Sequence, residues 1–200
     1  MSNAVFRSTG QALHVSFLME ILPSTQKGGT QIVIESLKRA QFVIDCAGMH
    51  TINSSGLSPL ELRGQCAMVR GSVDHHLPET ERAVVWARFG HQLRKAHGVL
   101  RLSAYLAALV PLSGEALKAL TWSCFVPMGT GRDRRNGRRN DWSLRKLERQ
   151  YGVPKATLHD ARQAIRYHAG HLEREAESRL QALFERTGLI ECEEALAEPA

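Results

Sequence analysis

The sequence has little cysteine, no long apolar run and no secretion signal. Its four cysteines are scattered singly without a Cys-x-x-Cys pair, which argues against a zinc site and favours reduced thiols in the cytosol. No run of 18 apolar residues occurs, so we expect no transmembrane helix. The start of the chain lacks a basic stretch followed by an apolar block and a cleavage site. These absences predict a cytoplasmic protein that does not associate with a membrane.

Catalytic and metal-binding signatures are also missing. The chain contains no Gly-x-Ser-x-Gly, no His-Glu-x-x-His and no paired-carboxylate motif. The cluster Asp74-His75-His76 is a weak metal candidate, because adjacent side chains on a helix point about 100° apart. Gly129-Thr130-Gly131 lacks the Gly-Lys-Ser/Thr end of a phosphate-binding loop. We therefore expect no catalytic residues, no cofactor and no metal, that is, a protein that is not an enzyme.

What the sequence does contain is an uneven distribution of charge. The net charge is +6 from 26 Lys and Arg and 20 Asp and Glu. Residues 132–155 hold nine Lys or Arg and three Asp or Glu, whereas residues 173–198 hold three Arg and eight Glu. A concentrated basic block is typical of chains that bind a polyanion. With 43% hydrophobic residues the chain can also bury a core, which excludes wholesale disorder.

Helix signals dominate, and no alternating strand pattern exceeds four residues, which predicts an all-α fold. The clearest helix start is Ser58-Pro59-Leu60-Glu61, which combines an N-cap serine, an N1 proline and a capping-box glutamate. Gly98 is expected to be the C-cap that ends the helix over residues 79–97. We expect helices over residues 9–22, 30–42, 58–77, 79–97, 102–110 and 114–125.

Residues 128–141 interrupt this helical pattern. They include three Gly, two Asn and five Arg and almost nothing to bury, a composition typical of a loop or linker. The sequence therefore predicts a helical body at 1–127, a basic loop or linker at 128–141, a C-terminal module at 142–190 and a frayed tail at 191–200.

Residues 143–163 have the pattern of two helices joined by a tight turn. Ser143 can cap the first helix, and Gly152 lies where the turn requires a residue that adopts positive φ. The residues expected to face inward are Leu144, Leu147, Tyr151, Val153, Leu158, Ala161 and Ile165. This register resembles the helix-turn-helix of bacterial and phage DNA-binding proteins. The apolar stripe continues to Leu183 with an interruption near Ala169-Gly170. It predicts a long trailing helix that packs on the body or pairs with a second subunit in a homodimer.

The chain departs from the helix-turn-helix family at two positions. Glu148 stands where the family usually has Ala, so its side chain must tilt outward or pair, for example with a nearby Arg. Pro154 stands where a Ser or Thr usually caps the second helix. Proline is compatible with the first helical turn but supplies no hydroxyl. Neither departure excludes the fold.

In this family the second helix enters the major groove with its N-terminal residues toward the base edges. The resemblance implies outward positions at Lys155, Ala156, His159, Asp160 and Gln163. Of these, Lys155 suits guanine, Gln163 suits adenine and Asp160 suits cytosine. Residues better suited to phosphates, which position a protein without reading sequence, are Thr157, Arg145, Arg149 and Arg162, together with Arg132, Arg134, Arg135, Arg138 and Arg139 of the basic loop.

The sequence thus predicts a protein that binds double-stranded DNA sequence-specifically and regulates transcription. Residues 5–23 resemble a family of small prophage-encoded bacterial proteins. The predicted architecture is similar to phage late-gene antitermination proteins, although the zinc-binding Cys pairs of some of them are absent here. Two alternatives stay open. One is an assembly or packaging protein that grips DNA, as small terminase subunits do. The other is a protein-interaction module that binds a partner such as RNA polymerase but no DNA.

Overall fold

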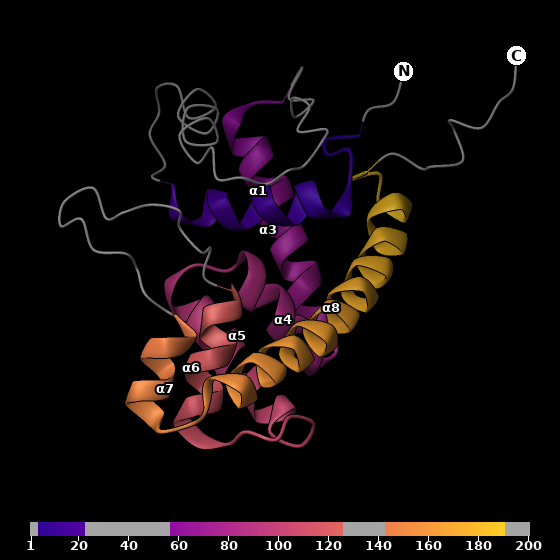
Figure 1. The fold of residues 1–200 in the computed structure, drawn as a ribbon. Helices are drawn as coiled ribbons and strands as arrows, with labels where there is room; N and C mark the ends of the chain where they lie inside the picture. Colours follow the sequence, from indigo (N-terminus) through magenta and orange to yellow (C-terminus); the bar gives the residue numbers. More distant parts are fainter. Residues whose placement is uncertain (1–3, 23–56, 126–142, 191–200) are drawn as a thin grey trace, which may run out of the picture. The chain divides into compact units, whose positions relative to one another are not determined.

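The computed structural model describes residues 4–22, 57–125 and 143–190 (Figure 1). Within these ranges the chain forms helices and one isolated parallel bridge between Phe6 and Ile190, so the expected all-α fold is confirmed. The expected helix at 30–42, the basic loop at 128–141 and the tail at 191–200 lie outside the described residues. The helices are α1 (Thr9–Ile21), α3 (Pro59–His76), α4 (Glu79–Phe89), α5 (Gln92–Leu106), α6 (Gly114–Phe125), α7 (Leu144–Tyr151) and α8 (Lys155–Arg186).

The chain divides into two compact units at boundaries that composition did not predict. One unit comprises residues 1–77 and 177–200 and the other comprises residues 78–176. The segment at 78–125, expected to belong to the N-terminal body, thus shares a unit with α7 and most of α8. Composition marks 128–141 as a linker, but the buried stripe of α8 continues through Ala169, Leu172 and Ala176 to Leu180 without a break. One helix therefore supplies core residues to both units.

In the first unit, α3 begins as the sequence predicts. The Ser58 hydroxyl accepts the Glu61 N–H, and the Glu61 carboxylate accepts the Ser58 N–H at 2.7 Å, which completes the capping box. Hydrogen bonds from the Ser58 side chain and from the Ser58 backbone N–H to the carboxylate lower the pKa of the Glu61 carboxyl. Two arginines of α3 also bond the main chain of the α1 segment. Arg63 donates to the Leu22 carbonyl at 3.0 Å, and Arg70 donates to the Ser16 carbonyl.

In the second unit, the prediction of a single helix over residues 79–97 is wrong. The helix ends at Phe89, and Gly90 donates its N–H to the Trp86 carbonyl at 2.9 Å. A second helix then begins at Gln92. Gly98 does not end a helix but lies inside α5, where a Cβ would stand 2.6 Å from the Ala87 nitrogen and 2.7 Å from the Ala83 carbonyl oxygen. The missing side chain of Gly98 therefore allows α5 to lie directly against the backbone of α4.

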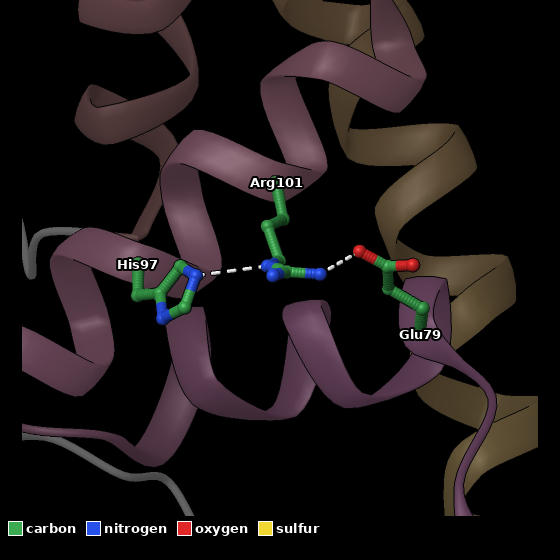
Figure 2. A network of polar contacts seen from close by, with 3 residues as sticks. All are labelled: Glu79, His97 and Arg101. Carbon is green, nitrogen blue, oxygen red and sulfur yellow. Dashed lines mark hydrogen bonds and ion pairs between the residues drawn. The ribbon is translucent and has the colours of Figure 1, made fainter.

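A polar network also joins α4 to α5 (Figure 2). Arg101 of α5 forms an ion pair with Glu79, the first residue of α4, and its Nε–H donates to His97 Nε2 at 2.8 Å. The His97 ring lies beside Trp86 of α4, with ring centroids 5.5 Å apart. Exposed ion pairs contribute little to stability, so we attribute the α4–α5 packing mainly to the close approach of the two helices at Gly98.

Candidate nucleic-acid interface

The predicted turn between α7 and α8 is confirmed. The Ser143 hydroxyl accepts the Lys146 N–H at 3.4 Å at the start of α7. Gly152 ends α7 in the left-handed region, with φ 68° and ψ 12°, and donates its N–H to the Glu148 carbonyl at 2.8 Å. After the turn, the Leu158 N–H donates to the Pro154 carbonyl at 3.0 Å as the first helical hydrogen bond of α8. The sequence therefore places two helices around a glycine turn.

The apolar stripe predicted for these helices is largely buried. Leu158 and Ile165 are fully buried, and Leu147 and Ala161 are each 1% exposed. Leu144, Tyr151 and Val153, the other predicted inward residues, are only half-buried. Four of the seven expected core positions thus lie in the core, and the remaining three lie at its edge. This burial fixes which side of α8 faces away from the core.

The two departures from the helix-turn-helix pattern meet in one contact. The Glu148 Oε1 accepts the Lys155 N–H at 3.0 Å, and within the described part of the chain Glu148 forms no ion pair with an arginine. The first N–H groups of any α-helix lack partners within the helix, and Pro154 has no side-chain acceptor to offer them. The Glu148 carboxylate supplies that acceptor from the preceding helix. A negative charge is also favourable beside a helix N-terminus.

The five predicted base-facing residues, Lys155, Ala156, His159, Asp160 and Gln163, are all exposed. Lys155, His159 and Gln163 follow one another every four residues, and Ala156 and Asp160 lie directly after the first two, so all five lie on one side of the first turns of α8. Two of them already contact one another, since Gln163 Nε2 lies 2.9 Å from His159 Nε2. The Gln163 amide is therefore held along the helix surface rather than projecting freely.

The predicted phosphate-contacting residues fall into three groups. Arg145 and Arg149 are exposed on α7, one turn apart, and Thr157 is half-buried on α8. Arg162 is half-buried on α8, and its guanidinium donates to the Ser123 hydroxyl of α6 at 3.0 Å. Part of its donor capacity is therefore used in helix packing, and its phosphate contact stays a prediction. The third group, Arg132, Arg134, Arg135, Arg138 and Arg139, lies outside the described residues.

Sequence reasoning missed two exposed residues on the same side of α8. Arg166 is exposed and Tyr167 is 69% exposed, and they follow Gln163 by three and four positions. That spacing was the signal that could have identified them. With these residues included, positions 143–167 contain six Lys or Arg and two Asp or Glu. The surface of α7 and early α8 is therefore positively charged, as a phosphate-binding surface must be.

The surroundings of Arg162 offer no reactive thiol. Cys124 follows Ser123 on α6, and burial raises the pKa of its thiol, although Arg162 and Arg166 partly oppose that rise. A buried thiol with a raised pKa is a weak nucleophile at neutral pH. Among the residues that the structure describes, no three His, Cys, Asp or Glu side chains lie together as a metal site requires.

Neither models of known protein families nor curated proteins match this chain. None of the helices in the described ranges is long and apolar enough to cross a membrane.

Proposed function

We propose that the protein binds double-stranded DNA sequence-specifically in the cytoplasm and regulates transcription. The observation that supports this most is the exposed polar side of early α8, which begins at Lys155 and continues through Gln163 above a buried stripe. An α-helix is about 10–12 Å across with its side chains, and the major groove is about 12 Å wide. The first turns of α8 therefore have the size and the polar surface that major-groove reading requires.

The side chains divide into two roles. Lys155, Asp160 and Gln163 offer donors and acceptors that match guanine, cytosine and adenine edges respectively. Arg145 and Arg149 on α7 are exposed cations that suit phosphates on the flank of the groove. To pair with an adenine through both its amide oxygen and its amide NH2, the Gln163 side chain must turn away from His159. The cost of breaking the Gln163–His159 hydrogen bond then reduces the binding free energy that Gln163 contributes.

The two roles predict two different binding phenotypes. Gln163→Ala should weaken binding by about 1–3 kcal/mol at one base position and leave the salt dependence nearly unchanged. The double variant Arg145→Ala, Arg149→Ala should weaken binding to every DNA about equally. It should also flatten the slope of log K against log salt by about 0.9 for each phosphate that the variant no longer neutralises. One titration series on a selected duplex and on a scrambled duplex measures both effects.

Matched controls come from the later turns of α8. Arg174→Ala with Arg186→Ala removes the same charge from exposed positions, and Gln181→Ala removes a second glutamine from the same helix. These controls should bind like the parent.

If Gln163→Ala weakens binding to both duplexes alike, α8 does not read sequence. Equal affinity for both duplexes together with a large ring in solution would identify a packaging protein, and no DNA binding at all would identify a protein-interaction module.

A further inference from the structure

Glu148 connects α7 to α8 through both its main chain and its side chain. Its carbonyl oxygen accepts the Gly152 N–H at 2.8 Å, which closes α7. Its carboxylate oxygen Oε1 accepts the Lys155 N–H at 3.0 Å, which opens α8. One residue therefore holds the backbone on both sides of the turn. Because Lys155, His159 and Gln163 belong to one continuous helix, a contact that fixes the first residue of this helix also fixes the side of α8 from which all three side chains extend.

The same contact places a negative charge where DNA phosphates would otherwise be attracted. The N-terminus of a helix is a natural anion site, because its N–H groups lack partners and the helix dipole favours negative charge there. In this protein the Lys155 N–H is already bonded to the Glu148 carboxylate. A carboxylate at this point also repels phosphates and offsets part of the Lys155 charge.

We propose that Glu148 is a positioning residue that sets the selectivity of α8, an inference that rests on the proposed DNA-binding function. Its hydrogen bond holds α8 in the orientation that reads bases. Its charge lowers the affinity for DNA of arbitrary sequence by discouraging phosphate contacts at the start of α8. The first effect needs only a hydrogen-bond acceptor, whereas the second needs a carboxylate, so two substitutions separate them.

Glu148→Gln keeps an oxygen acceptor and removes the charge. We expect it to raise the affinity for a selected duplex and for a scrambled duplex alike, by about two- to fivefold, with their ratio unchanged. Glu148→Ala removes both the acceptor and the charge. We expect it to raise the affinity for the scrambled duplex similarly but to lower the ratio of the two affinities by about fivefold, because removal of a helix cap destabilises the start of a helix by a comparable factor.

Amide hydrogen exchange measured on the full chain without DNA tests the contact separately. The Lys155 N–H should exchange slowly in the parent and in Glu148→Gln, and faster in Glu148→Ala. Glu175→Gln is the matched charge control, since it changes an exposed glutamate on the same helix. It lies 20 residues beyond Lys155, which is about 30 Å along the helix and well beyond the Debye length of about 8 Å. It should therefore bind both duplexes like the parent.

The outcomes distinguish this inference from the function on which it rests. If the parent binds both duplexes equally or neither, the proposed function fails and the selectivity role of Glu148 fails with it. If the parent discriminates but Glu148→Ala keeps the parent's affinity ratio, Glu148 is not a positioning residue and the proposed function stands. If both variants lower the affinity for both duplexes by the same factor, Glu148 has a merely structural role and the proposal is wrong.

Discussion

Replacing Leu158 with alanine should lower the free energy of unfolding by about 2–5 kcal/mol. Leu158 is fully buried on the first turns of α8, and Leu147 of α7 is 1% exposed. Removing the leucine side chain forfeits its burial and leaves a cavity that the two helices can refill only in part. Because the same core positions the exposed side of α8, we expect DNA binding to weaken as well. Urea unfolding followed by circular dichroism measures the change in stability.

Leu93→Ala is the control for Leu158→Ala. Leu93 lies on α5 of the same unit and is 85% exposed, so its truncation should change stability by no more than about 0.5 kcal/mol. If Leu158→Ala unfolds at the same urea concentration as Leu93→Ala, the packing that we describe for α7 and α8 is wrong.

Gly98→Ala should destabilise the protein by about 1–3 kcal/mol or more. In most helices this change is favourable, because alanine has the higher helix propensity by about 1 kcal/mol. At this position the new Cβ would stand 2.6 Å from the Ala87 nitrogen and 2.7 Å from the Ala83 carbonyl oxygen. Both are backbone atoms of α4, so no side chain can rotate away and the two helices must move apart. Thermal unfolding of the variant measures the destabilisation.

Gly170→Ala is the opposite case in the same unit. Gly170 lies within α8, and a Cβ built on it meets no atom within 4 Å. We expect this variant to be more stable than the parent by about 0.5–1 kcal/mol. Replacing these two helical glycines by alanine should therefore change the stability in opposite directions. A Gly98→Ala variant that is as stable as Gly170→Ala would contradict the α4–α5 packing.

Local signals in the sequence predict the start of α7 and the glycine turn before α8 well. Ser143 and Gly152 each act within one turn of the chain, through a cap and a left-handed residue, and both occur where expected. The capping box at Ser58 and Glu61 is equally local and equally well predicted. Helix ends of this kind depend on residues three or four positions apart, which a sequence shows directly.

Features that depend on distant residues could not be predicted in the same way. Gly98 resembles a helix C-cap by itself, and only the closeness of α4 shows that it is a packing position. Arg162 is a residue type that suits phosphate contacts, but the sequence does not show that its guanidinium donates to the hydroxyl of Ser123, 39 residues earlier. The Glu148 contact crosses a turn, seven residues apart, which is beyond the reach of helical periodicity.

Selection of duplexes from a randomised DNA library at physiological salt tests the central claim most directly. We expect the parent protein to enrich one motif of a few base pairs. Gln163→Ala should relax the preference at a single position of that motif, while the Arg174→Ala, Arg186→Ala control should enrich the same motif as the parent. A library that binds without any enrichment, or that does not bind, would contradict sequence-specific recognition by α8.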